Sequence, residues 1–261
     1  MGRVIAFSQL PAYLEQVEAA NPALTRATIL DTNVLITSGY EVRAEFEHVH
    51  GVLDLLNDRG YRLLATVNTK AEFLEFQRRL HLTETLLDMV DQHSRMRIPS
   101  AARAKITTLK GSLSTAVGAD PERDFVFNDV HLKKIKKEFS AGPHSGRTGW
   151  LEICTNFLNG HLQAMAQELE DSGVEYVSQH VSSQTDLFHT KIDWPDAMGI
   201  VEKTGVSFSD SMILNAFQCS HCPFIVSMDF DVGYAVLADP RLKDSIMPDR
   251  LAAEYRHYHF R

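Results

Sequence analysis

The hydrophobic positions of the chain form two patterns, which separate the expected strands from the expected helices. Short apolar runs at 27–31, 61–67, 174–178 and 224–228 are typical of strands buried on both faces of a parallel sheet. The weaker run at 245–248 predicts an edge strand. Segments with helical spacing of apolar residues lie between these runs. Strands that alternate with helices predict an α/β protein with a central parallel sheet.

Helix boundaries follow from this periodicity and from residues that favour helix ends. The segment 41–58 has apolar residues at helical spacing, and Gly60 is its expected C-terminal cap. This helix is expected to cross over the sheet between two parallel strands. Thr69 is the expected N-cap of a helix that ends near residue 79, and a further helix is expected at about 82–97.

Length and cysteine content limit the class of protein. The chain has 261 residues, enough for a full hydrophobic core, and its three cysteines form no even disulfide framework. No stretch approaches the ~20 apolar residues that a membrane-spanning helix needs. We therefore expect a soluble protein, without a membrane segment, in the reducing environment of the cytoplasm.

Four acidic residues stand at the start or end of expected elements, far apart in the sequence: Asp31, Glu72, Asp210 and Asp229. Ligands of open α/β sheets bind outside the carboxyl ends of parallel strands, so these four side chains are expected to converge. Clustered carboxylates hold Mg²⁺ or Mn²⁺. The sequence therefore predicts a divalent-metal site, with Asp231 as a supporting or second-metal ligand.

Four motifs, taken in order, resemble the PIN domain, a family of metal-dependent nucleases that mostly cut RNA and that includes many bacterial toxins of toxin–antitoxin pairs. The motifs are ILDTNVLI at 29–36, TKAEF at 69–73, DSMILNA at 210–216 and VSMD at 226–229. The resemblance covers residues 27–97 and roughly 175–247. It implies a three-layer α/β/α, Rossmann-like core built around the parallel sheet.

The resemblance also implies a function for the site. The four acidic residues would be the catalytic metal ligands of an endoribonuclease, which needs no protein nucleophile. Thr32, Asn33 and Ser227 would orient the carboxylates or contact the scissile phosphate. The chain is longer than the compact toxins of the family, which argues against a toxin role. RNA is the expected partner, and an antitoxin or other protein inhibitor, and a homodimer, are left open.

The two acidic residues nearer the start of the chain, Asp31 and Glu72, also have a purely local interpretation. Asp31 could form a turn with Asn33. Glu72 could complete a capping box, in which its carboxylate accepts a hydrogen bond from the Thr69 amide. In that case Glu75, on the same helix face, would be the alternative ligand.

The other two acidic residues have local alternatives as well. Asp210 could complement the dipole of a helix whose N-cap is Ser209. Asp229 could close the turn that ends its strand, and Asp231 could then supply the carboxylate instead. The resemblance favours the ligand interpretation for Asp210 and Asp229, because the four motifs occur in the same order as in the PIN domain.

The middle of the chain, residues 98–173, lacks the resemblance and is expected to be a helical insertion between the core segments 1–97 and 174–261. From Arg95 to Lys137, ten basic residues stand against four acidic ones, a net charge of +6 in a chain of net charge −8. This segment is the expected RNA-binding surface. Its alternative is a solvated helix face. The candidate contacts are Lys133, Lys134, Lys136, Lys137 and, in a following loop, Arg147.

Three further interpretations compete with a nuclease site. A non-catalytic PIN-like scaffold would bind RNA or a protein without cutting, but all four acids are present. A Rossmann-like small-molecule phosphatase needs a second Asp two residues after its nucleophilic Asp, and that position is Asn33. Cys219 and Cys222 form half of a tetrahedral zinc site, with His257 and His259 as distant partners, and are interpreted as structural.

Overall fold

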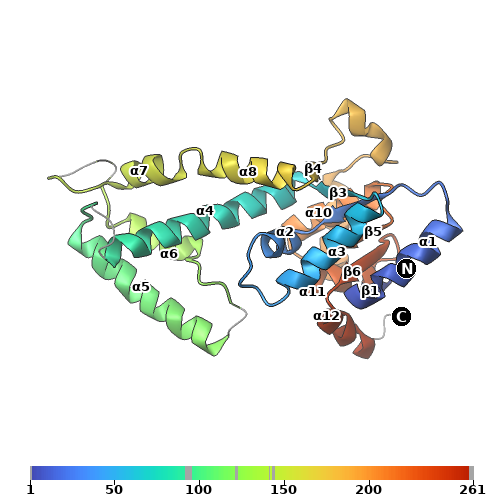
Figure 1. The fold of residues 1–261 in the computed structure, drawn as a ribbon, viewed down its shortest axis with the longest axis horizontal. Coiled ribbons are helices and arrows are strands. Elements are labelled where there is room, and N and C mark those ends of the chain that lie inside the picture. The colour runs from blue at the N-terminus through green and yellow to red at the C-terminus, as the bar shows by residue number, and fades with distance from the viewer. Residues whose placement is uncertain (1, 92–95, 121–122, 141, 143–144, 259–261) are drawn as a thin grey trace. The chain divides into compact units, whose positions relative to one another are not determined.

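The computed structural model describes residues 2–91, 96–120, 123–140, 142 and 145–258, and the chain divides into two compact units (Figure 1). The sheet unit comprises Met1–Phe73 and Leu169–Arg261, and the helical unit comprises Leu74–Glu168.

The unit boundaries fall inside two helices, α4 (Val67–Val90) and α8 (His161–Asp171). They therefore differ from the sequence-based boundaries after residues 97 and 173. The two helices expected at 69–79 and 82–97 form the single helix α4, because no Gly or Pro interrupts the chain between them.

The sheet unit is built on six parallel strands in the order β1-β6-β5-β2-β3-β4. The strands are β1 (Val4–Ala6), β2 (Ala27–Leu30), β3 (Arg62–Ala65), β4 (Val174–Tyr176), β5 (Phe224–Val226) and β6 (Asp244–Met247). The expected α/β class with a central parallel sheet is confirmed. The expected edge position of β6 is wrong, because β1, which the sequence analysis missed, pairs with its outer side.

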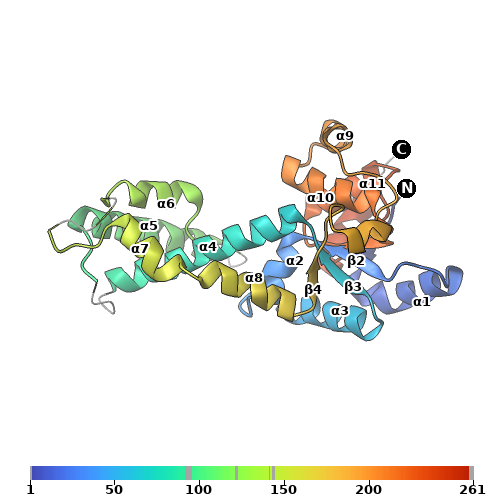
Figure 2. The ribbon, with the colours of Figure 1, turned by 90° about the horizontal axis from the view of Figure 1, so that it is seen from above.

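Helices lie on both faces of this sheet, which gives an α/β/α layering (Figure 2). One face carries α1 (Leu10–Ala20) and α3 (Phe46–Asp58); the other carries α10 (Phe208–Cys219) and α11 (Phe230–Ala238). Helix α9 (Trp194–Thr204) packs against α10 and α11. The shorter helices are α2 (Thr32–Ser38), α12 (Asp249–Glu254) and 3₁₀ turns at Phe7–Gln9, Ser182–Leu187 and Tyr255–His257.

The end of α3 confirms one expected cap. The helix ends at Asp58, and Gly60 follows with a φ of 72°. Glycine adopts this left-handed conformation without the steric cost that a Cβ atom imposes. The chain therefore reverses directly from α3 into β3.

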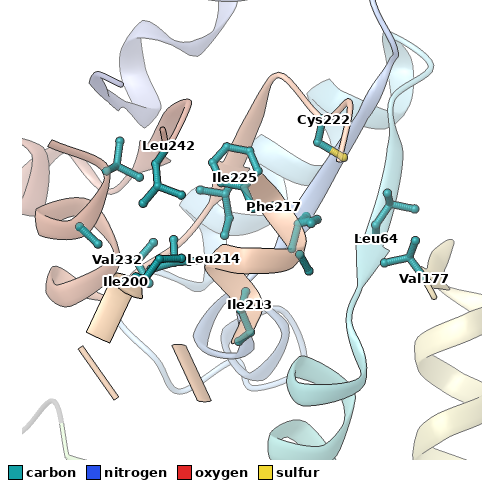
Figure 3. Packing of buried hydrophobic residues seen from close by; sticks show 14 of the residues in the cluster. Leu64, Val177, Ile200, Ile213, Leu214, Phe217, Cys222, Ile225, Val232 and Leu242 are labelled. Carbon is teal, nitrogen blue, oxygen red and sulfur yellow. The ribbon is translucent and has the colours of Figure 1, made fainter. Parts of the chain in front are cut away.

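A hydrophobic core fills the space between the sheet and the layer of α9, α10 and α11 (Figure 3). The sheet contributes Ile29, Leu64 and Ile225, all almost fully buried. The helices contribute Ile200, Ile213, Leu214, Phe217 and Val232 to the same core. This packing fixes α10, whose first turn carries Asp210, and α11, whose N-cap is Asp229.

The helical unit has a hydrophobic core of its own. Its further elements are α5 (Ser100–Ala119), α6 (Asp129–Lys136), α7 (Trp150–Ile153) and a π-helical turn at Cys154–Leu158. Buried residues from α4 to α7 form one cluster, which includes Leu86, Ile106, Phe127, Leu132 and Trp150. Within the described residues of both units, no helix is long and apolar enough to cross a membrane.

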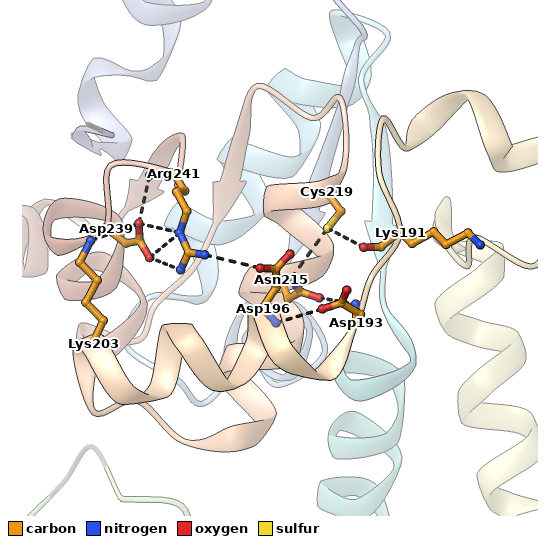
Figure 4. A network of polar contacts seen from close by, with 8 residues as sticks. All are labelled: Lys191, Asp193, Asp196, Lys203, Asn215, Cys219, Asp239 and Arg241. Atoms are coloured by element: carbon orange, nitrogen blue, oxygen red, sulfur yellow. Dashed lines mark hydrogen bonds and ion pairs between the residues drawn. The ribbon is translucent and has the colours of Figure 1, made fainter.

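A polar network around Asp239 joins α9 to the end of α11 (Figure 4). The Asp239 side chain is fully buried; it accepts hydrogen bonds from the backbone amide and guanidinium of Arg241, and the Lys203 ammonium lies 3.4 Å away. The same guanidinium lies 3.6 Å from Asp196 on α9. Burial would raise the pKa of Asp239, but the hydrogen bonds and charge of Arg241, with Lys203, outweigh it and lower the pKa to about 2.

We expect the substitution Asp239→Asn to lower the free energy of unfolding at neutral pH by about 1–3 kcal/mol, because it weakens several charge-assisted hydrogen bonds of a buried group. A carboxyl group whose pKa is depressed on folding contributes stability above its unfolded pKa of about 4. That contribution is lost as the pH falls through about 2. Denaturant titrations of both proteins between neutral pH and about pH 2 should converge at the acidic end. A difference that stays constant would contradict the ionic role of Asp239.

Candidate functional site

The carboxyl ends of β2 and β5 form the centre of the site. These strands pair in register, with Ile29 opposite Ile225 and Leu30 opposite Val226. The Asp31 amide extends the ladder by donating to the Val226 carbonyl at 2.9 Å. Two acidic positions, Asp31 after β2 and Asp229 after β5, are therefore brought to the same edge of the sheet.

Asp31 is the most buried of the acidic residues in the site, with 2% of its surface exposed. It is the N-cap of α2, where one carboxylate oxygen accepts from the Thr32 amide at 2.7 Å and the other accepts from the Ser227 hydroxyl at 2.8 Å. Burial raises the pKa of Asp31 to about 7; the charges of Asp229 and Asp210 act in the same direction, and the two hydrogen bonds oppose them. The local alternative for Asp31, a turn with Asn33, does not form, because the carboxylate accepts from the Thr32 amide instead.

Glu72 does not form the capping box that was its local alternative. Helix α4 begins at Val67, and the Thr69 amide donates to the Thr66 hydroxyl at 3.2 Å. The Glu72 carboxylate accepts instead from the Thr32 hydroxyl at 2.5 Å and from the Ser209 hydroxyl. Glu72 therefore joins α2 to α10 across the edge of the sheet.

Asp210 lies in the first turn of α10, but the expected cap Ser209 is wrong. The cap is Ser207, whose hydroxyl accepts from the Asp210 amide at 3.1 Å and donates to the Asp210 carboxylate at 2.6 Å. This leaves the Ser209 hydroxyl to bond Glu72. Burial raises the pKa of Asp210, and the charges of Glu72 and Asp231 add to that effect.

Asp229 is the N-cap of α11, and its carboxylate accepts from the Asp231 amide at 2.8 Å. Its own amide donates to the Ser227 hydroxyl at 3.0 Å, so this one hydroxyl bonds both Asp31 and Asp229. Burial raises the pKa of Asp229, and the charges of Asp210, Asp231 and Glu72 contribute. The Asp231 side chain is exposed.

Hydroxyl groups hold three of the four acidic residues that form the carboxylate cluster (Asp31, Glu72, Asp210 and Asp229), and Asp210 lies beside one of these hydroxyl residues, Ser209. Ser209 bonds Glu72, Thr32 bonds Glu72, and Ser227 bonds Asp31 and the Asp229 amide. Among the described residues, no three His, Cys, Asp or Glu side chains are already spaced to enclose a metal ion. The donor set nevertheless consists of oxygen atoms alone, which suits Mg²⁺ and Mn²⁺ and disfavours softer metals.

The residues expected to assist the cluster fall into two groups. Thr32 and Ser227 hold carboxylates directly, as described above. Asn33 lies half-buried in the first turn of α2, and no hydrogen bond within the described part of the chain joins its amide to the cluster. The sequence-based prediction overlooked Ser207 and gave Ser209 the role of a cap, although both serines precede Asp210 in the segment SFSDS and hydroxyl groups at helix starts are common carboxylate partners.

Three other sequence candidates lie apart from the cluster. Glu75, the alternative ligand, is paired with Arg78 through a hydrogen bond of 2.8 Å. Cys219 and Cys222 are buried, and the Cys219 thiol donates to the Lys191 carbonyl at 3.4 Å. His257 is exposed, while His259 lies outside the described residues, so the CxxC motif has structural contacts and lacks a described zinc partner.

The basic candidates belong to the helical unit. Helix α6 buries Leu132 and Ile135, and the remaining side carries four exposed lysines: Lys133, Lys134, Lys136 and Lys137. Within the described part of the chain, none of the four ammonium groups has an ion-pair partner within 4 Å. Arg147 is exposed in the loop before α7. Arg95, at the start of the basic segment, lies outside the described residues.

Comparison of the chain with models of protein families, with curated proteins and with solved structures found no match. The chemistry of the site therefore has to be inferred from its own residues.

The buried charge of Asp31 predicts how the metal-free protein responds to pH. A carboxyl group with a raised folded pKa contributes most stability below its unfolded pKa, about 4, and loses it as the pH rises through about 7. We expect Asp31→Asn to raise the melting temperature above pH 7 and to have little effect near pH 4. The substitution removes the free-energy cost of burying an ionised carboxylate, which exists only where Asp31 is ionised.

Asp54→Asn, on the exposed side of α3, is the matched control and should show no such pH dependence. Mn²⁺ should raise the Tm of the wild type more than that of Asp31→Asn if Asp31 binds the ion. Melting curves in chelator and in Mn²⁺ across this pH range decide the matter: equal Tm values for wild type and Asp31→Asn at pH 8 in chelator would contradict a buried, ionised Asp31.

Proposed function

We propose that this protein is a Mg²⁺- or Mn²⁺-dependent endoribonuclease with a PIN-like core, which hydrolyses RNA phosphodiester bonds at the carboxylate cluster. The observation that carries the proposal is the set of hydroxyl contacts at this sheet edge: Ser227 bonds both Asp31 and the Asp229 amide, and Glu72 is held between Thr32 and Ser209, next to Asp210. Four acidic side chains at one edge of a sheet repel one another, so such a cluster is costly without a cation.

The residues present fit the proposed metal. Asp31, Glu72, Asp210 and Asp229 would hold it, with Asp231 as a supporting ligand, because all offer carboxylate oxygens at the same sheet edge. When bound, divalent ions neutralise charge on a phosphate and activate water for attack. The protein's own contribution is to orient the ligands: Ser227 fixes Asp31, while Thr32 and Ser209 fix both oxygens of Glu72.

The helical unit completes the proposal by supplying positive charge for a polyanion. Its four exposed lysines on α6 form the proposed surface for the RNA backbone, with Arg147 as a further contact. All three cysteines are free thiols, which supports a reducing compartment such as the cytoplasm. Binding experiments can test for a protein inhibitor or antitoxin as a second partner and for formation of a homodimer.

We expect Asp31→Asn and Glu72→Gln each to reduce RNA cleavage by roughly 100-fold or more, because even residues outside the ligand set change metal-dependent activity by 10- to 100-fold. Glu72→Gln keeps a side chain that can bond the Thr32 and Ser209 hydroxyls, so its Tm should change little. The measurement is the cleavage rate of labelled RNA and DNA pools with Mn²⁺, with Mg²⁺ and with chelator.

Asp54→Asn and Glu47→Gln, both exposed on α3, are the matched controls and should cut at the wild-type rate. Cleavage of RNA in chelator, or undiminished cleavage by Asp31→Asn, would show that the carboxylate cluster is not the active site. RNA binding without cleavage in any metal would favour a non-catalytic scaffold.

Changing Lys133, Lys134, Lys136 and Lys137 together to Ala should weaken RNA binding and flatten its salt dependence. The slope of log affinity against log salt should fall by up to about 0.7 for each phosphate of a single strand that the variant no longer neutralises. Cleavage of a saturating short substrate should change much less, because the carboxylate cluster is untouched.

The matched control replaces the same four lysines with Arg, which preserves charge and should preserve the slope. Binding is measured across a salt series with the Asp31→Asn background, so that substrate is not consumed. An Ala variant with unchanged affinity and slope would identify the lysines as a solvated helix face.

A further inference from the structure

Two aromatic side chains of the sheet unit are exposed where a folded protein normally buries them. Trp194 is 60% exposed and Phe208 is 53% exposed, and their ring centroids lie 6.4 Å apart. By contrast, the second tryptophan of the chain, Trp150, is only 7% exposed in the core of the helical unit. Exposed aromatic groups that cluster, unlike single exposed apolar residues, mark binding surfaces.

The aromatic pair, Trp194 and Phe208, reaches the carboxylate cluster along the chain, because Phe208 lies two residues before Asp210. Phe208 is the first residue of α10, between the cap Ser207 and Ser209, which bonds Glu72. Trp194 is the first residue of α9, directly after its cap Asp193. The pair therefore borders the turn of the chain that carries Asp210.

Both rings lie on helices that the polar network joins to each other (Figure 4). The Asp193 amide donates to the Asn215 side chain on α10 at 3.1 Å, and its carboxylate caps α9 by accepting from the Asp196 amide at 2.9 Å. Fixed aromatic surfaces lose little conformational entropy on binding.

A second aromatic group adjoins the cluster from α11. Phe230 lies between Asp229 and Asp231 and stacks on Tyr255, with ring centroids 4.9 Å apart and an angle of 15° between the rings. Tyr258 packs against Phe230 at 5.8 Å and is itself 47% exposed. Aromatic residues are thus neighbours in sequence of the acidic residues at the starts of both α10 and α11.

We infer that Trp194 and Phe208 form a stacking platform for unpaired bases of a single-stranded nucleic acid whose backbone is held at the carboxylate cluster. Exposed aromatic rings bind single strands of any sequence, since every base offers a π-face to stack on. Bases inside a duplex already stack on each other and leave no face for a protein ring. The inference rests on the proposed nuclease function, because that function places a strand at the cluster, and it adds that the strand is unpaired.

Tryptophan fluorescence tests the platform separately from catalysis. In the full-length Asp31→Asn protein, a short oligouridylate should quench the emission of Trp194 in a saturable manner, and the same sequence in a duplex should quench it far less. Trp194→Phe leaves the buried Trp150 as the only tryptophan, so its emission should not respond to the oligonucleotide.

Affinity supplies the second measurement. Trp194→Ala and Phe208→Ala should each weaken oligouridylate binding between about 5-fold and 100-fold, the range for removal of one base-stacking interaction. Trp194→Phe and Phe208→Tyr keep a ring and should restore most of the affinity. Val42→Ala, at an exposed apolar position in the sheet unit, is the control and should bind as the wild type does.

The possible results separate the platform from the nuclease. If the wild type cuts RNA while the Ala variants bind it normally and no quenching occurs, the platform is wrong and the nuclease stands. If quenching and the affinity losses occur without cleavage in any metal, the platform stands and the catalytic proposal fails. If the Ala variants alter only self-association in size-exclusion chromatography, the aromatic pair docks another copy of the chain, and the inference is overturned.

Discussion

The burial of one carboxylate, that of Asp31, is the constraint on which the arrangement of the carboxylate cluster depends. Its position after the central strand β2 removes it from water, and burial raises its pKa to about 7. Two hydrogen bonds from Thr32 and Ser227 offset part of that cost. A buried carboxylate with a raised pKa is costly to the fold, so the hydroxyl and amide partners around Asp31 are best understood as the means of holding it.

Hydroxyl groups are the means by which the sheet unit holds several acids together. A hydroxyl can donate to one carboxylate and accept from an amide at the same time, as Ser227 does between Asp31 and Asp229. Lys or Arg side chains in these places would neutralise the carboxylates and compete with a cation. Serine and threonine orient the acids and leave their negative charge available.

Much of this arrangement could be predicted from the sequence, because strand burial and parallel pairing are encoded in short apolar runs. Those runs placed Asp31 and Asp229 at strand ends, and parallel topology brings such ends to one edge. The partners of the acids could not be assigned in the same way. Whether Ser207 or Ser209 caps α10 depends on where the helix begins, and a shift of two residues exchanges their roles.

Tertiary contacts also decided the features that the sequence analysis missed. Strand β1 is a run of three residues, too short to show a period, and it exists because it pairs with β6. The aromatic pair carries no sequence signal at all, since Trp194 and Phe208 occupy positions where an apolar residue would ordinarily be assigned to the core. Their exposure is visible only once α9 and α10 are packed.

The local and the catalytic interpretations of the acids are compatible, because the same geometry serves both. Asp31 and Asp229 cap α2 and α11, Asp210 lies in the first turn of α10, and Glu72 lies near the start of α4. Four helices thus direct their N-termini, with partial positive charge, toward the same edge of the sheet. Those dipoles lower the cost of gathering negative charge, although they do not remove it, since the pKa values of Asp31, Asp210 and Asp229 are all raised. Burial is the main cause of these raised values and mutual repulsion adds to it. The proposed divalent cation would relieve that repulsion, so the capping roles are compatible with the proposed metal site.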